Sequence, residues 1–176
     1  SEKLITPSCT TCGARHKSVF CNQNQEQLIE TDQRKSCDFY QKNEVIFSEG
    51  QYSKGLYCVN KGKIKLLKSG AQGKDQIIRF ATAGDVMGYH SLLTDTPLSA
   101  SARAIDDAAV CFIPADQFFN LIKKDHQFSL KLLELSAKNW NNASKLVTDM
   151  AQKTSKQRLA EMLLWLDSTF GETKEG

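Results

Sequence analysis

The feature that most constrains the fold is a series of short runs between residues 39 and 113, in which apolar and polar side chains alternate. Alternation places every second side chain on one face of a strand, so we expect Ile64 and Leu66 to face a core while Lys63 and Lys65 face water. Turn-forming residues separate the runs at Ser48–Gly50, Asn60–Gly62, Ser69–Gly70, Gly73–Asp75, Gly84–Asp85, Thr94–Pro97 and Asp106–Asp107. This spacing predicts a compact all-β roll or barrel.

The last two runs and the first helices follow from local signals. Ser101–Ile105 and Ala109–Ile113 flank an Asp-Asp turn, so we expect them to pair as a hairpin. Pro114 cannot donate to a ladder and is expected to end the last strand. Helices are predicted at about Gln25–Gln33 and at about Ala115–Lys123.

A much longer helix is predicted at about His126–Met150, with Asp125 as its N-cap. Its apolar residues have the three-four spacing of a coiled-coil seam: Leu130, Leu133, Ala137, Trp140, Ser144, Val147 and Ala151. A second stripe contains Leu132, Leu135, Ala143, Leu146 and Met150. Two stripes need two burial partners, so we favour a parallel homodimer over a helix that only covers its own domain. No like charges lie on the seam, which predicts a dimer that persists without a cofactor.

The segment from Thr154 to Gln157 fits a capping box and opens a further helix. That helix continues through Leu159, Met162, Leu163, Leu166 and Phe170. The chain stops at Gly176, so we expect the new unit to be represented by its first helix alone.

The six cysteines indicate either disulfides or metal and redox chemistry, and the expected cellular compartment decides between the two. No apolar run approaches the roughly 18 residues that cross a bilayer, and the start of the chain lacks the apolar core of a signal peptide. We therefore expect a soluble, cytoplasmic protein, in which cysteines indicate metal or redox chemistry more than disulfides. The formal net charge of +3 is too small to indicate a phosphate-binding surface by itself.

Cys9 and Cys12 form a CxxC pair, and Cys21 follows nine residues later. A tight turn between two such thiolates points both sulfurs at one metal centre. A four-thiolate site would need one more ligand, and Cys111 is the best candidate. It lies on the face of its strand opposite Val110 and Phe112, so it can point out of the roll toward an arm laid across it.

Four local segments resemble a known family: Gly55–Lys65, Ala83–Gly88, Val110–Pro114 and Gln157–Ala160. With the order of cysteine-rich arm, roll, long helix and capped helix, they resemble the CRP/FNR family of bacterial transcription regulators. The resemblance implies an α+β fold: a cyclic-nucleotide-binding-like antiparallel β-roll (jelly roll), a long dimerisation helix and the first helix of a winged helix-turn-helix domain. The implied domains are an arm at 1–24, a sensor roll at 25–124, a dimerisation helix at 125–151 and the start of the DNA-binding domain at 152–176.

Within the family the chain looks most like the FNR branch, whose members hold an oxygen-sensitive [4Fe-4S] cluster. Cys9, Cys12, Cys21 and Cys111 match the four ligand positions, although the gap from Cys12 to Cys21 is longer than in the best-known members. The resemblance implies a regulator that is not an enzyme, senses oxygen or redox state, binds DNA and contacts RNA polymerase. In the family the tip of the Ser69–Asp75 hairpin, which carries Lys74 here, can make the polymerase contact.

Other ligands of the roll stay open as alternatives. The family's cyclic-nucleotide site has a Glu after a Gly and an Arg before a small residue. Here Tyr89 and Leu98 occupy those positions, so we expect no cyclic AMP unless Arg103 substitutes. A haem or nitric oxide sensor would use His90, with His16 or Cys58 as less well placed ligands.

Three further interpretations of the cysteines remain. The arm could hold structural zinc, or Cys9 and Cys12 could form a redox dithiol. The dithiol is disfavoured because the arm lacks the strand and helix that lower the pKa of such a thiol. Cys37 and Cys58 are interpreted as small core residues.

Overall fold

The computed structural model describes residues 7–70 and 73–171, without the side chains of residues 169 and 170. The chain divides into two compact units, one up to Leu132 and one from Leu133. Within the described residues, none of the helices is long and apolar enough to span a membrane.

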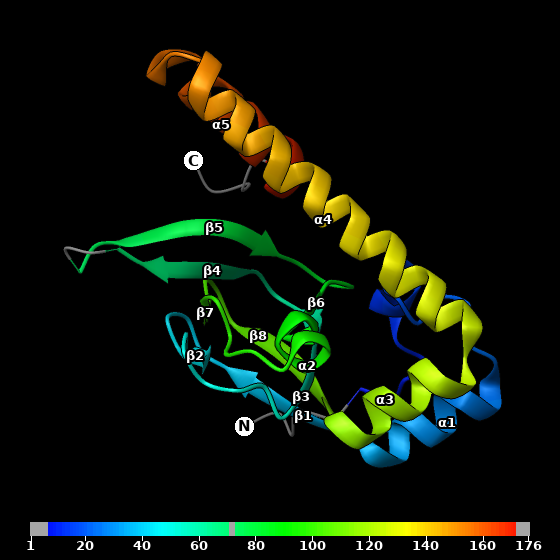
Figure 1. Cartoon of the computed structure of the whole chain (residues 1–176). Coiled ribbons are helices and arrows are strands. Elements are labelled where there is room, and N and C mark those ends of the chain that lie inside the picture. The colour runs from blue at the N-terminus through cyan, green and yellow to red at the C-terminus, as the bar shows by residue number, and fades with distance from the viewer. Residues whose placement is uncertain (1–6, 71–72, 172–176) are drawn as a thin grey trace. The chain divides into compact units, whose positions relative to one another are not determined.

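The first unit is built on two four-stranded sheets (Figure 1). One sheet has the order β1 (Ser36–Tyr40), β8 (Ala108–Pro114), β3 (Gly55–Lys61) and β6 (Val86–Met87). The other has the order β2 (Val45–Phe47), β7 (Ser101–Ala104), β4 (Ile64–Ser69) and β5 (Asp75–Ala81). All their pairings are antiparallel. The predicted α+β fold with an antiparallel roll is therefore confirmed.

The roll encloses an apolar core to which both sheets contribute. Its buried members are Phe47, Val59, Ile64, Ala81, Met87, Leu98, Ala102, Ala104, Ala108 and Val110. The prediction that Ile64 and Leu66 face the core is confirmed, because Ile64 is buried in the core and Leu66 packs against it. Leu67 is buried as well, and the register of β4 with β5 shifts between Leu66 and Leu67, where β5 has one extra residue, Ile78.

The predicted hairpin of Ser101–Ile105 with Ala109–Ile113 is wrong. The two strands exist as β7 and β8, but β7 pairs with β2 and β4 while β8 pairs with β1 and β3. The Asp-Asp turn therefore carries the chain from one sheet to the other. Asp106 Oδ1 accepts a hydrogen bond of 2.7 Å from the Lys63 amide, so this turn is fastened to the turn before β4.

The helices are α1 (Gln25–Arg34), α2 (Tyr89–Thr94), α3 (Ala115–Lys124), α4 (His126–Gln152) and α5 (Ser155–Phe170), preceded by a 3-10 turn, η1 (Gly13–Lys17). Four helices lie close to their predicted positions, and α2 and the 3-10 turn were not predicted. Figure 1 shows α1 and α3 side by side, and Arg34 of α1 makes an ion pair of 2.6 Å with Asp116 of α3. Asp125 caps α4 by accepting a 3.0 Å hydrogen bond from the Phe128 amide.

The second unit contains the rest of α4 and α5. The predicted capping box is present, because Thr154 and Gln157 each accept from the other's backbone amide. Lys153 joins the two helices with ion pairs to Asp149 at 2.9 Å and to Glu161 at 2.7 Å. Apolar side chains remain exposed on α5, among them Leu159, Leu163 and Leu164.

Candidate metal centre

Three cysteines form a row across the first sheet. Cys111 on β8 lies directly opposite Cys37 on β1 and directly opposite Cys58 on β3. Partners opposite each other in antiparallel strands project from the same face of the sheet. Val110, the neighbour of Cys111, belongs to the roll core, so the cysteine row lies on the outer face.

The N-terminal arm covers this outer face. Its η1 turn packs against β3, and Asn60 of β3 donates a hydrogen bond of 3.2 Å from Nδ2 to the Cys12 sulfur. Gly84 has a φ of +99°, and a Cβ there would lie 2.9 Å from the Cβ of Lys17 and 3.0 Å from the Ala14 carbonyl oxygen. A glycine at this position therefore lets the arm lie close against the roll.

Cys9 is held by the end of α1. Its amide donates a 2.8 Å hydrogen bond to Asp32 Oδ1, and Lys35 Nζ lies 2.7 Å from the same oxygen. Burial alone would raise the pKa of Asp32, but the hydrogen bonds from Lys35, Cys9 and Ser8 lower that pKa to about 2. The carboxylate is therefore ionised at neutral pH and fixes the backbone of the CxxC segment.

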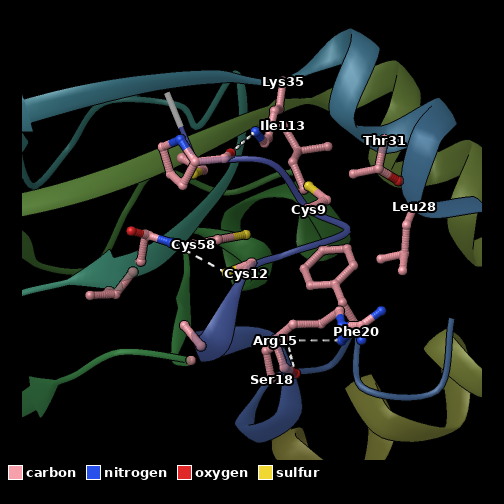
Figure 2. Close-up of a pocket in the computed structure, with 16 residues that line it drawn as sticks. Cys9, Cys12, Arg15, Ser18, Phe20, Leu28, Thr31, Lys35, Cys58 and Ile113 are labelled. Atoms are coloured by element: carbon pink, nitrogen blue, oxygen red, sulfur yellow. Dashed lines mark hydrogen bonds between the residues drawn. The ribbon is translucent and has the colours of Figure 1, made fainter. Parts of the chain in front are cut away.

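The arm and the sheet enclose a cavity of about 50 Å³ that several of the cysteines line. Figure 2 shows Cys9, Cys12 and Cys58 around this space, and Cys111 completes the set of lining thiols. Of the four predicted ligands the structure thus gathers Cys9, Cys12 and Cys111. Cys21 does not line the cavity, and its sulfur lies 3.6 Å from Asn22 Oδ1.

The surface of the cavity is almost wholly apolar, but several residues around it carry groups that a thiolate-bound cluster uses. Lys35 and Arg15, both cationic, are among the lining residues. Arg15 Nε and Thr31 Oγ1 are buried donors at its wall that have no hydrogen-bond partner within the described part of the chain. Such donors commonly bind and tune the sulfur atoms of iron–sulfur clusters.

The thiols are gathered but are not at ligand distances from one another. Across residues 7–70 and 73–171, no three His, Cys, Asp or Glu side chains lie close enough together to hold a metal ion as they stand. Burial raises the pKa of Cys9 to about 12 and the pKa of Cys58 well above the usual value. A hydrogen bond with Cys37, and then burial, raise the pKa of Cys111. Binding a metal here would therefore release protons and draw the arm closer to the sheet.

The same arm contacts the beginning of α4. The rings of Phe20 and Phe128 lie 5.2 Å apart between centroids, and both side chains are buried. Gln23 donates a hydrogen bond of 3.2 Å from Nε2 to Asp125 Oδ2, so it binds the residue that caps α4. The arm is thus packed against, and hydrogen-bonded to, the first turn of the long helix.

The interior of the roll offers less for a ligand. Tyr89 and Leu98, at the two positions where the family carries its nucleotide anchors, are buried apolar side chains with exposures of 1% and 7%. Arg103, the possible substitute, lies on β7 opposite Val45 and Lys65. His90 stacks on Tyr89 with ring centroids 4.2 Å apart, and His16 is exposed on η1.

The comparisons with known proteins place the chain in a family. Residues 38–125, half of the chain, match the cyclic nucleotide-binding domain. The chain therefore belongs to the family of cyclic nucleotide-binding domains. Its relatives confirm the more specific resemblance to the CRP/FNR regulators, in their FNR-like branch.

Two curated relatives illustrate this. The fumarate and nitrate reduction regulatory protein of Vibrio cholerae is 26% identical over 167 residues, which are 93% of this chain and 66% of the relative. The anaerobic regulatory protein of Haemophilus influenzae is 25% identical, over 88% of this chain and 60% of the relative. Both are named as regulatory proteins, in agreement with the prediction that the chain is not an enzyme.

Solved structures confirm the fold. The catabolite activator protein of Thermus thermophilus superposes with a TM-score of 0.68 at 24% identity, over 84% of this chain and 70% of that one. A c-di-GMP responsive global regulator from Xanthomonas campestris reaches a TM-score of 0.71 at 12% identity, over 86% and 76% of the two chains.

Sequence reasoning does not identify two of the cysteines or the Asp32–Lys35 pair as part of the site. It interprets Cys37 and Cys58 as core residues, but Cys58 lines the cavity and Cys37 lies 3.1 Å from Cys111, sulfur to sulfur. The signal that could have shown this is the register of three strands, because only the register reveals that the cysteines share a face. Asp32 and Lys35 look like ordinary surface residues of a helix end in the sequence alone.

Proposed function

We propose that the chain is the sensor and dimerisation part of a cytoplasmic CRP/FNR-type transcription regulator, which responds to oxygen or redox state through a [4Fe-4S] cluster. The domain division at 1–24, 25–124, 125–151 and 152–176 belongs to this proposal. The chain spans at most two thirds of the two curated relatives described above. DNA binding is therefore proposed for a further part of the whole protein.

One observation carries the proposal: Cys9, Cys12 and Cys111 come from distant parts of the chain and line one cavity. Cys21 is the fourth ligand that we propose, and it reaches the cavity by a shift of the arm segment between Cys12 and Phe20. When bound, the cluster supplies an oxygen-sensitive link between arm and sheet. Arg15 and Thr31, whose buried Nε and Oγ1 atoms have no hydrogen-bond partner within the described residues, line the same cavity.

The arm's own contacts convert this link into a signal. Phe20 and Gln23 hold the N-terminal turn of α4 through Phe128 and Asp125. When Cys21 binds the cluster, its neighbours Phe20 and Gln23 shift with it, so their contacts with the first turn of α4 change. When the cysteines are released, the arm takes up the contacts described above, and this difference changes the packing or register of the helix.

The test is the content of iron, acid-labile sulfide and zinc per chain after purification without oxygen. The wild type is compared with Cys9→Ser, Cys111→Ser and Cys21→Ala, and Cys58→Ala is the matched control within the cavity wall. Four iron and four sulfide per chain, lost in the first three variants and on exposure to air but kept in Cys58→Ala, support the proposal. Zinc in place of iron, or no metal, contradicts it, and loss in Cys58→Ala but not in Cys21→Ala would make Cys58 the fourth ligand.

The dimer belongs to the same proposal and rests on α4. Leu130, Leu133, Trp140 and Val147 of the predicted seam are between 59% and 75% exposed in the single chain. A long apolar stripe of this kind indicates an association surface. The predicted interface, which also includes Ala137 and Ser144, is thus free to meet a second copy of α4.

Sedimentation velocity of the metal-free chain tests the dimer. Trp140→Asp places a charge in the seam and is expected to give monomer, while Asn142→Asp, off the seam on the same helix, is expected to stay dimeric. A monomeric wild type at micromolar concentration would contradict the dimer. The proposed polymerase contact at the Ser69–Asp75 hairpin includes residues 71 and 72, which lie outside the described residues.

A further inference from the structure

The pair formed by Cys37 and Cys111 has a feature that cluster binding does not use. Cys111 Sγ lies 3.1 Å from Cys37 Sγ, the donor and acceptor of a thiol hydrogen bond. The two residues are also directly opposite each other on β1 and β8. Cys37 is not one of the four proposed cluster ligands.

The register fits the geometry of a disulfide. Opposite residues of antiparallel strands have Cα atoms about 4.5 to 5.5 Å apart, and disulfides bridge Cα atoms about 4.4 to 6.8 Å apart. The sulfurs must approach from 3.1 Å to about 2.05 Å, which side-chain rotation can supply without moving the strands.

We propose that Cys37 and Cys111 form a reversible disulfide whenever no cluster holds Cys111, so that Cys111 has two exclusive bonding states. The pair is a site of oxidation in its own right, and its competition with the cluster rests on the proposed function. The disulfide withholds one ligand, so a chain that has lost its cluster cannot rebuild it until a reductant has acted.

A low-molecular-mass disulfide such as oxidised glutathione is the co-reactant. The Cys37 thiolate attacks one sulfur of oxidised glutathione, which forms a mixed disulfide and releases one glutathione. The Cys111 thiolate then attacks the Cys37 sulfur and releases the second glutathione, so two electrons and the two thiol protons end on the two glutathione molecules. Cys37 reacts first because it is partly exposed, whereas Cys111 is only 7% exposed.

Peptide mapping of the whole chain tests the disulfide directly. The metal-free chain is incubated with oxidised glutathione, its remaining thiols are alkylated, and it is digested with trypsin without reduction. Cys37 and Cys111 then lie on separate peptides, 36–42 and 104–123, and neither peptide holds another cysteine. A linked pair of these peptides is expected in the wild type and in Cys58→Ala, and it is expected to disappear in Cys37→Ala and Cys37→Ser. Linkage of Cys111 to Cys9, Cys12 or Cys58, or no linkage at all, would overturn the proposal.

A second measurement tests the competition with the cluster. After oxidised glutathione treatment, the wild type is expected to take up iron and sulfide only when a dithiol reductant is added, whereas Cys37→Ala takes them up without it. Equal uptake by both chains without reductant would contradict the competition. If neither chain takes up iron under any condition, the cluster proposal fails while the peptide map still decides the disulfide.

Discussion

The roll has two places where a small group could be sensed, and they differ in chemistry. The cavity under the arm is lined by four thiols, Lys35 and Arg15, and the buried donors Arg15 Nε and Thr31 Oγ1 have no partner among the residues that the structure describes. Inside the roll, Tyr89 and Leu98 are buried and bring no charge to the positions where the nucleotide anchors were expected. Under the proposed function, the sensor site of this roll lies on the outer face of one sheet and not in the interior.

Loss of the aromatic contact between arm and helix should have the largest effect on stability. Phe20→Ala removes a ring that is 8% exposed and packs on Phe128, and we expect the free energy of unfolding to fall by about 3 kcal/mol. Phe47→Ala, inside the roll, is the matched control and should cost a similar amount. Urea denaturation measures both, and limited trypsin digestion at Arg15 should accelerate only in Phe20→Ala. If digestion at Arg15 is accelerated equally in Phe47→Ala, the arm and the roll interior unfold together and not as separate regions.

The ion pair at the end of α1 should have a smaller effect. Lys35→Met leaves the Asp32 carboxylate without its 2.7 Å partner and weakens the support of Cys9, at an expected cost of about 2 kcal/mol. Lys68→Met, on the exposed end of β4, removes the same charge at little or no cost. The midpoints of urea unfolding of the two variants check this. Similar midpoints would show that the Asp32–Lys35 ion pair does not stabilise the protein.

The sequence predicts features that depend on neighbouring residues better than features that depend on contacts between distant segments. The long helix α4, both capping residues Thr154 and Asp125, and the extent of the roll follow from periodicity and local hydrogen bonding, and all of them appear as predicted. The seam on α4 stays a prediction. The pairing of β7 and β8 failed because an Asp-Asp turn can join two sheets as well as two strands of one sheet. The sequence also cannot show that Cys37 and Cys58 flank Cys111, since register is set by long-range packing.

Titration of His90, an exposed residue at the start of α2 beside the buried Tyr89, is expected to have a smaller effect. Partial desolvation, and then the charge of Arg79, lower the pKa of His90 from its ordinary value of 6.5. As the pH falls below 6.5, the unfolded chain binds a proton that the folded chain resists, so stability present above that pH is lost. His90→Gln should abolish this loss, which we expect to be about 1 °C or less in Tm between pH 7 and pH 5. A loss that persists in the variant would assign the pH dependence to other groups.

The last prediction is an effect of nearly zero, and it bears most directly on the comparison of the two regions. A phosphate that entered the roll would meet Leu98 where an Arg is needed, and an unpaired buried charge is costly. Millimolar cyclic AMP should therefore leave the Tm of the chain unchanged within about 1 °C, because a ligand stabilises only the state that it binds. Differential scanning fluorimetry, with adenosine as the control for base binding alone, makes the measurement. A rise of several degrees that disappears in Arg103→Gln would show that Arg103 has replaced the missing anchor, and the roll interior would then be a second sensor beside the thiol cavity.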